Sequence, residues 1–415
     1  MNTLPAGPPS SWPGGPGSVF PSGIAGRRPS RRPFYVVGHD LVLGRSGGRL
    51  VASREGRPVT SAPLGRLSEV VLFGNVAVTT PAMNALLAED VPLVLLRADG
   101  RPRGRLEPPR ASHIEARRRQ LALSTDPAAR LQAARAMVRG KLQNQDILLR
   151  RRAARSDFRD DVLVFARRVS QAVGRVDEAR AVDELIGIEG AAAGAYFAAI
   201  RLLVPADCAF RRRGRHEPDI VNVLVNYTSA VLRELVFGAV VAAGLDPYVS
   251  FLHTPRAGRP SLVFDLMEEW RPVLLESTVL GLLGLRTVTP ADLLPPVTPA
   301  DRGRRSTSNG EPPGPPDAAA SAGRVEAQPA DLAGSGTGPA GTGTHDVADS
   351  QPARPVLSTA ATAAVLARFR GKVEAPARAW APTGGRSYGG CVRRQALALR
   401  EAILGGAPYE PFRWR

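Results

Sequence analysis

Short apolar runs separated by turn residues fill the chain from Phe34 to Leu106. The runs FYVV, LVLG, RLVAS, EVVLFG and VPLVLLR are rich in Val and Leu, and closely spaced runs of this length predict a small all-β domain. One short helix is expected within it, because Thr79 or Thr80 can cap a helix and Pro81 suits the first turn. Turns are expected at Gly47-Gly48, Gly56 and Asp99-Gly100.

From about Pro109 the apolar spacing becomes helical. SHIEARRRQLALS and the long segment after Asp126-Pro127 carry apolar residues on one side and arginines on the other. A further helix is expected from Asp219 to Val241, ended by Gly244, and another is expected to begin near Ser261. The apolar stripe of the Asp219 helix comprises Ile220, Leu224, Tyr227, Val231 and Leu235.

Two segments are too rich in Pro, Gly, Ala and Ser to form a core, and both are expected to be disordered. The predicted fold class is therefore α+β, with a small all-β domain followed by a larger all-α domain. The expected ranges are a basic tail at 1–33, the β-rich domain at 34–107, the α-helical domain at 108–295, an insertion at 296–355 and a C-terminal helical part at 356–415.

The charge balance indicates a nucleic-acid partner. Lys and Arg total 55 against 38 acidic residues, a net charge of +17, and Lys141 and Lys372 are the only lysines. Arginine binds phosphate with two parallel hydrogen bonds. A GC-rich genome also favours arginine codons, but that bias does not explain the size of the net charge. The arginine-rich helix faces, each either solvated or in contact with phosphates, contain Arg117, Arg118, Arg119, Arg150, Arg151 and Arg152.

Cysteine and hydropathy patterns exclude other classes. Cys208 and Cys391 are far apart in the sequence, which excludes a disulfide framework or a cysteine-rich metal site, and both are expected to be buried fillers. The start of the chain has no signal-like apolar run, and no stretch reaches the ~18 apolar residues of a spanning helix. The chain is expected to be cytoplasmic.

Asp265 and Glu268 are candidates for chemistry because residues three apart share one side of a helix. Glu269 is rotated by roughly 100° from that side, which makes it a poorer ligand. Arg271 can pair with Glu268 or reach a phosphate. The alternative interpretation is an ordinary surface ladder of acidic and basic side chains.

Glu189 and His253 add two further donors. Glu189 lies between Ile188 and a run of Gly and Ala, so its half-buried carboxylate needs a cation or a hydrogen-bond donor. The alternatives are a salt-bridged helix glutamate and, for His253, a core histidine. Carboxylates with one imidazole can hold a hard divalent cation such as Mg²⁺ or Mn²⁺. Together these residues favour metal-dependent phosphodiester chemistry.

Several motifs occur along the chain in one order: EGAAAGAYF, Pro218 with Asp219 and Asn222, GLDPYVSFLH, RPSLVFDLMEEWRP and YEPFRWR. In this order they closely resemble the Cas-one (Cas1) family of CRISPR-associated integrases, over the whole chain except the tail and the insertion. The resemblance implies that Glu189, His253 and Glu268 are metal ligands of the catalytic site and that Asp265 supports them. The resemblance suggests Arg256 and Arg271 as residues near the DNA, and Arg259 is a further DNA-binding candidate.

The resemblance also implies an activity and partners. Members of the family join the 3′-hydroxyl ends of a short prespacer duplex to the leader–repeat ends, and they can cut branched DNA. They act as homodimers, two of which flank a dimer of the companion protein Cas-two (Cas2). The alternatives are a structure-specific repair endonuclease that uses water at the same site and a non-catalytic DNA-binding scaffold.

The chain departs from the family pattern at a few positions. Ser250 stands where the family usually has Gly, and Gly194 replaces a basic residue. The segment FRRRGRHEPDIVN matches the family's Pro-rich loop only loosely, and the insertion interrupts the last helices. None of these departures removes an expected ligand, so they concern DNA positioning rather than chemistry.

Overall fold

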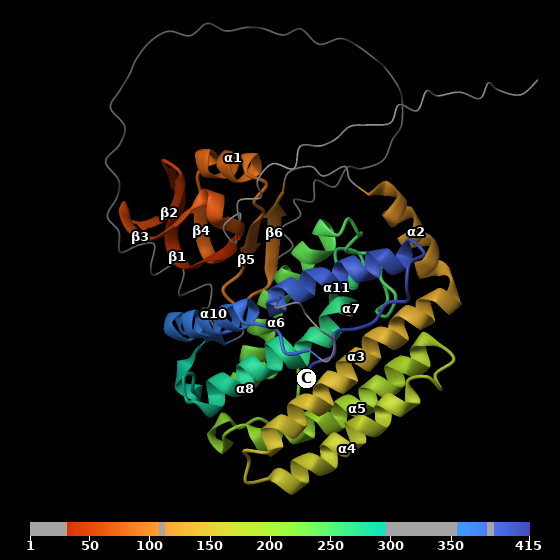
Figure 1. Cartoon of the computed structure of the whole chain (residues 1–415). Helices are drawn as coiled ribbons and strands as arrows, with labels where there is room; N and C mark the ends of the chain where they lie inside the picture. Colours follow the sequence, from red (N-terminus) through yellow and green to blue (C-terminus); the bar gives the residue numbers. More distant parts are fainter. Residues whose placement is uncertain (1–30, 108–112, 296–354, 380–385) are drawn as a thin grey trace, which may run out of the picture.

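The computed structural model describes residues 31–107, 113–295, 355–379 and 386–415. A β-sheet near the beginning of the chain packs against a larger helical body, which confirms the predicted α+β class (Figure 1). Residues 1–30 of the predicted tail and residues 296–354 of the predicted insertion are outside the described part of the chain.

Within the described residues, six strands form one mixed sheet in the order β3-β2-β1-β4-β5-β6. The strands are β1 (Arg32–Ser46), β2 (Arg49–Arg54), β3 (Arg57–Pro63), β4 (Leu67–Val78), β5 (Leu93–Leu96) and β6 (Pro102–Leu106). FYVV and LVLG belong to the single strand β1. Strands β3 and β6 are not among the predicted apolar runs, because edge strands need little apolar surface and these read RPVTSAP and PRGRL.

The centre of the sheet is buried on both faces. β4 pairs in parallel with β1 and β5. Val70 and Leu72 of β4 pack beneath helix α1 (Thr80–Ala88), whereas Val71 and Phe73 belong to the core of the helical body. The Thr79 side chain caps α1, as expected. The sheet and the helical body therefore share a core rather than touching only at their surfaces.

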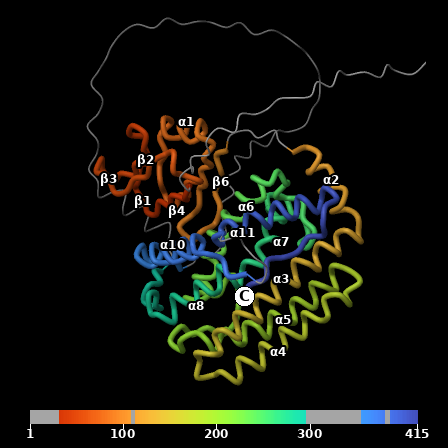
Figure 2. The backbone as a smooth tube through the Cα atoms, in the orientation of Figure 1, coloured from red at the N-terminus to blue at the C-terminus, as the bar shows by residue number. Residues whose placement is uncertain are grey.

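The helical body contains the remaining long elements. They are α2 (Ile114–Thr125), α3 (Pro127–Ala153), α4 (Arg159–Arg175), α5 (Val182–Leu203), α6 (Ile220–Ala242), α7 (Ser261–Trp270), a π-helical turn (Arg271–Glu276), α8 (Ser277–Gly284), α10 (Thr359–Glu374) and α11 (Tyr388–Ile403). The short strands β7 (Leu293–Leu294) and β8 (Val356–Leu357) pair, and 3₁₀ turns occur at Leu64–Arg66, Ala206–Cys208 and Pro290–Asp292. Helices α3, α4 and α5 lie side by side (Figure 2).

Most helix boundaries follow the predicted signals. Asp126 caps α3, Asp219 caps α6, and Gly244 adopts a φ of +77° just beyond the end of α6. The predicted apolar stripe of α6 is buried except for the half-buried Leu235. Cys208 and Cys391 are buried free thiols, as expected.

The expectation that no segment is long and apolar enough to span a membrane is wrong when helices are judged by length and composition alone. Helices α5 and α6 both meet those two criteria. In the α6 window 67% of the residues are buried inside the protein, and core helices pass the same test. The apolar length of α6 is explained by its central position, between the sheet and the helices α7 and α11.

The segment after α11, which contains Tyr409, Phe412 and Trp414, packs against α7 and holds it in place. Phe412 stacks on Trp270 of α7 with ring centroids 4.3 Å apart. Glu269 accepts hydrogen bonds from the Tyr409 hydroxyl at 2.8 Å and the Phe412 amide at 2.5 Å. Asn144 of α3 donates to the carbonyls of Glu269 and Phe412 and accepts from the Trp414 amide. This network fixes α7 against α3.

The contact between the sheet and α6 predicts a pH dependence of stability. Burial, and then the nearby Glu234, raise the pKa of Glu69 on β4 to about 7. A carboxyl group whose pKa is higher in the folded state than in the unfolded state contributes its full stabilisation at low pH. That stabilisation is lost as the pH rises from about 4.5 towards 7. We expect Glu69→Gln to reduce the loss of stability between pH 5 and pH 8 by about 2–3 kcal/mol, measured by urea unfolding. An unchanged pH profile would contradict this assignment.

Candidate active site

Side chains from several elements converge near the end of α7. Lys141 comes from α3, Glu189 from α5, His253 from the loop before α7, Glu268 from α7, and Arg271 from the π-helical turn. The Lys141 ammonium lies between the two glutamates, with Nζ 2.5 Å from Glu189 Oε1 and 2.5 Å from Glu268 Oε2. The helix packing thus assembles residues that are distant in sequence.

Glu268 is the electrostatic centre of this cluster. Its Oε1 lies 3.2 Å from Arg271 Nε and 3.9 Å from His253 Nε2. Burial on its own raises the pKa of the Glu268 carboxyl, but Lys141, Arg271 and His253 outweigh it and lower the pKa to about 2. The Oε2 atom is in ion contact with Lys141 but receives no well-directed hydrogen bond. Glu268 is therefore an anion whose charge is balanced by surrounding cations.

Asp265 organises the loop that carries His253. Its fully buried carboxylate accepts hydrogen bonds from the backbone amides of Phe251, Leu252 and His253 at 2.7–3.0 Å. Its Oδ1 also lies 2.7 Å from His253 Nδ1. With Nδ1 protonated and donating to Asp265, Nε2 presents its lone pair on the side of Glu268. Asp265 therefore positions the imidazole, and its own oxygens are already engaged.

Glu189, on helix α5, contacts the same Lys141 ammonium as Glu268. Its side chain is 24% exposed, and Lys141 Nζ donates to its Oε1. Gly190 and Gly194, on the same helix, are exposed, and neither would meet another atom within 4 Å if it carried a side chain. The helix surface beside Glu189 is thus open to a bulky partner.

The acidic residues of α7 are not a surface ladder. Asp265, Glu268 and Glu269 are all buried. Glu269 points away from the cluster towards Tyr409 and Phe412, and burial raises its pKa to about 7. Glu276 is also buried with its pKa raised by burial to about 7, and it accepts a hydrogen bond from the Tyr196 hydroxyl at 3.1 Å.

The donor set fits a hard divalent cation. In the described ranges no three His, Cys, Asp or Glu side chains already stand in a ligating cluster, because Lys141 lies between Glu189 and Glu268. The ammonium is a stand-in cation, since both carboxylates direct an oxygen at the same positive charge. Two carboxylates and an imidazole nitrogen within a few ångströms are ligands suited to Mg²⁺ or Mn²⁺.

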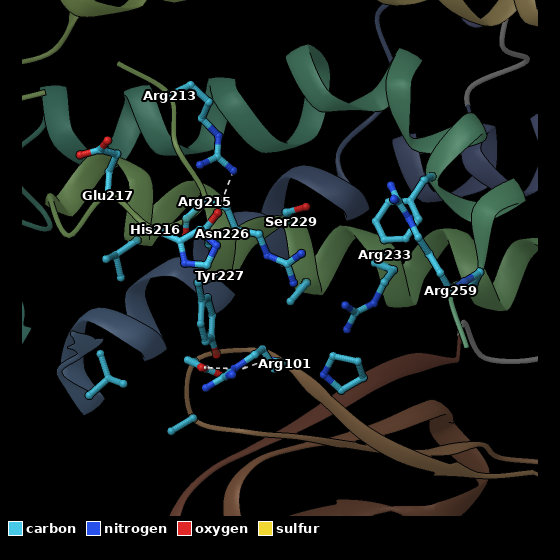
Figure 3. A pocket seen from close by; sticks show the side chains of 18 of the residues that line it. Arg101, Arg213, Arg215, His216, Glu217, Asn226, Tyr227, Ser229, Arg233 and Arg259 are labelled. Atoms are coloured by element: carbon cyan, nitrogen blue, oxygen red, sulfur yellow. Dashed lines mark hydrogen bonds and ion pairs between the residues drawn. The ribbon is translucent and has the colours of Figure 1, made fainter. Parts of the chain in front are cut away.

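An arginine-lined cavity of about 560 Å³ borders this cluster (Figure 3). It lies between the β5–β6 turn, α6 and the loop before α7, and Tyr227 forms part of its wall. Its arginines are Arg101, Arg213, Arg215, Arg233, Arg256, Arg259 and Arg271, and the acidic residues described in its lining are Asp99 and Glu217. Burial and the neighbouring Arg271 lower the pKa of Arg213 to about 10. The crowded positive charge suits an anionic ligand.

All three arginines expected to bind DNA line this cavity. Arg256 and Arg259 form a backbone bridge, and Arg259 stacks over the Phe264 ring at 4.6 Å. The arginines on the helix faces are differently placed, since Arg119 pairs with Glu115 and Arg151 stacks on Trp414. Several residues of those faces are thus engaged with the protein itself.

Residues around the cavity also explain two sequence features. Asn222 holds the loop of the FRRRGRHEPDIVN segment, because it accepts from Arg213 and the Gly214 amide and donates to the Arg212 carbonyl. The Ser250 hydroxyl donates to the His253 carbonyl at 2.6 Å. Ser250 therefore closes the loop that carries the histidine.

Lys141 is a residue of the site that was not predicted from the sequence. A usable signal was present, because Lys141 is one of two lysines in a chain whose other cations are arginines. The contact between Lys141 and both glutamates depends on how α3, α5 and α7 pack, which periodicity does not specify.

Comparisons with known proteins agree with the architecture. Residues 34–296 match the family described as CRISPR associated protein Cas1. A CRISPR-associated endonuclease Cas1 from Thermus thermophilus is 36% identical over 261 residues, which cover 62% of this chain and 76% of that protein.

Two solved structures share the fold at low sequence identity. A casposase bound to an integration product has a TM-score of 0.68 at 16% identity and covers 92% of both chains. A chain of a Cas6-RT-Cas1–Cas2 complex has a TM-score of 0.69 at 16% identity, with 92% of this chain and 36% of that chain covered. At these identities the likeness concerns the fold alone. The extent of the family match shows that the chain belongs to the Cas1 family of CRISPR-associated proteins, whose named relatives are endonucleases.

Proposed function

We propose that this protein is a metal-dependent DNA integrase of CRISPR adaptation, which joins the 3′-hydroxyl ends of a prespacer duplex to the leader–repeat ends. The observation that carries the proposal is that Glu189 and Glu268 direct an oxygen at one cation, the Lys141 ammonium, while His253 Nε2 lies 3.9 Å from Glu268 and an arginine-lined cavity borders the cluster. The casposase of the same fold, bound to an integration product, supports the reaction class.

Glu189, Glu268 and Nε2 of His253 would hold Mg²⁺ or Mn²⁺, which when bound lowers the pKa of the attacking hydroxyl and stabilises charge on the phosphate. Asp265 keeps the imidazole oriented through the 2.7 Å contact to Nδ1. Arg271, 3.2 Å from Glu268, is placed to hold a phosphate oxygen at the edge of the cluster.

The reaction needs no protein nucleophile. A 3′-oxygen of the prespacer forms a bond to phosphorus, and the bond between that phosphorus and the leaving 3′-oxygen of the repeat strand breaks. The proton lost by the attacking hydroxyl is replaced on the leaving oxygen from solvent. One phosphodiester is exchanged for another, so the energetic demand falls on orientation and charge stabilisation.

The proposal includes partners. We propose that two homodimers flank a dimer of a Cas2 companion and present the duplex to the repeat. The Cas6-RT-Cas1–Cas2 complex supports this, because one of its chains shares the fold described above.

The deciding experiment is strand transfer of a labelled duplex with 3′-hydroxyl ends into a plasmid that carries a leader–repeat. It is run with Mn²⁺ or a chelator, and with or without the companion protein. The proposal requires joining only with the metal, and faithful insertion at the repeat only with the companion. Cleavage without joining would instead identify a nuclease, and binding without either would identify a scaffold.

The arginine cavity predicts a salt-dependent contribution to DNA binding. We expect Arg256→Ala combined with Arg259→Ala to weaken binding and to reduce the slope of log K against log salt by about one to two, because each phosphate contact releases a counterion. The measurement is fluorescence anisotropy between low and moderate salt. The matched control is Arg167→Ala combined with Arg168→Ala on the exposed face of α4. Equal slopes in both double variants would exclude the cavity as a phosphate site.

A further inference from the structure

The Lys141 ammonium occupies the position that a divalent cation bound by Glu189 and Glu268 would need. Its side chain is only 12% exposed, and its Nζ lies 2.5 Å from one oxygen of Glu189 and from one oxygen of Glu268. Its backbone is held in place one turn further along α3, where Asn144 donates to the carbonyls of Glu269 and Phe412. The ammonium is therefore a built contact of the site rather than a loose surface charge.

The ammonium and a divalent cation cannot occupy that position together. Mg²⁺ binds carboxylate oxygens at about 2.0–2.1 Å. Because the two glutamate oxygens are each 2.5 Å from Nζ, a cation bonded to both would overlap the ammonium and repel it. The lysine stem is flexible, with rotatable bonds that let Nζ swing away while α3 stays fixed.

We propose that Lys141 is a positioning residue that binds Glu189 and Glu268 in competition with the divalent cation. It keeps the two carboxylates paired and directed at one point, and it raises the concentration of divalent cation that the site requires. This inference rests on the metal dependence proposed above, but its test needs neither DNA nor turnover.

A purely structural role for Lys141 predicts the opposite sign. If the ammonium only cross-linked α5 to α7, its removal would let the carboxylates separate and would weaken metal binding. If it competes, its removal leaves two unneutralised carboxylates and strengthens metal binding. The direction of the change in affinity therefore separates the two roles.

The first measurement is Mn²⁺ titration by electron paramagnetic resonance on the full chain. We expect Lys141→Met to bind Mn²⁺ about tenfold more tightly than the unmodified protein, because a competing cation is removed. Lys372→Met is the matched control, since Lys372 contacts Ser277 and the Trp414 ring instead. Equal or weaker Mn²⁺ binding by Lys141→Met would overturn the proposal.

The second measurement uses the unmodified protein and does not depend on how the variant folds. Because the chain has two lysines, isotope labelling of lysine gives two side-chain NMR signals, which Lys372→Met assigns. Titration with Mg²⁺ is expected to move the Lys141 signal from its ion-paired position to that of a solvated lysine and to leave the Lys372 signal in place. A Lys141 signal that stays fixed when the site is saturated with Mg²⁺ would refute the competition.

If Mg²⁺ displaces Lys141 but strand transfer is absent, the competition stands and the proposed integrase activity fails. If strand transfer depends on metal but the Lys141 signal does not move, the integrase activity stands and the competition fails. The two proposals are thus tested separately.

Discussion

Replacing His253 with Ala is expected to lower the rate of strand transfer by more than about 100-fold, because loss of a ligand should exceed the 10- to 100-fold cost of losing a residue that supports one. DNA affinity should stay within about twofold of the unmodified value, since phosphate contacts by arginines supply most of it. The measurement is single-turnover joining of a labelled duplex in Mn²⁺, with affinity determined separately by anisotropy.

The matched control is His39→Ala, which changes an exposed histidine of the β-sheet domain. It should integrate at the unmodified rate. Glu189→Ala is expected to behave like His253→Ala, because both residues are proposed ligands of the same metal ion and both border Glu268, Glu189 through Lys141 and His253 at 3.9 Å. Integration at the unmodified rate by either variant would show that the assignment of this site is wrong.

The second large effect concerns stability. Asp265→Ala is expected to reduce the free energy of unfolding by about 3–6 kcal/mol, because two buried backbone amides and one half-buried amide lose their acceptor and each unsatisfied buried group costs about 1–3 kcal/mol. Those amides belong to Phe251, Leu252 and His253. Urea unfolding followed by circular dichroism measures the change. Such a loss is a large part of the total stability of a typical domain.

Asp265→Asn separates this structural role from orientation of the imidazole. The amide keeps one acceptor oxygen, so we expect a smaller loss of stability than for Asp265→Ala. Its NH₂ group cannot accept the Nδ1 proton, so weaker Mn²⁺ binding is expected even where the protein is folded. If Asp265→Asn binds Mn²⁺ as tightly as the unmodified protein, Asp265 supports the loop but does not orient the histidine.

The sequence predicted helix starts and ends well where they depend on interactions between neighbouring residues. The cap at Thr79, the Asp126 start of α3 and the Gly244 end of α6 each depend on neighbouring residues, and the structure has all three. The edge strand β3 escaped prediction because its residues are mostly exposed and need no apolar alternation. Register and strand order come from long-range pairing, which no short window of sequence contains.

Glu189, His253 and Glu268 could be named as candidates from the sequence, but Lys141 and the geometry of the cluster could not. The three-residue spacing of Asp265 and Glu268 placed both on one side of α7, yet Asp265 turns to the loop amides while Glu268 turns to Lys141. That division depends on where the loop of residues 251–253 crosses the helix. The ligand roles of Glu189, His253 and Glu268 stay predictions that the experiments above test.

Because the segment Tyr409–Trp414 holds α7 in place, α7 can reach its final packing only after that segment has been synthesised. Glu269 and Phe412 are 143 residues apart, so at 5–20 residues per second the ribosome needs roughly 7–29 s between them. Throughout that interval the nascent chain carries Glu269 without its amide partner and Trp270 without its stacking ring. Helix α7 therefore acquires its final support late in translation, and an emerging chain halted before Phe412 would expose apolar surface that the complete chain covers.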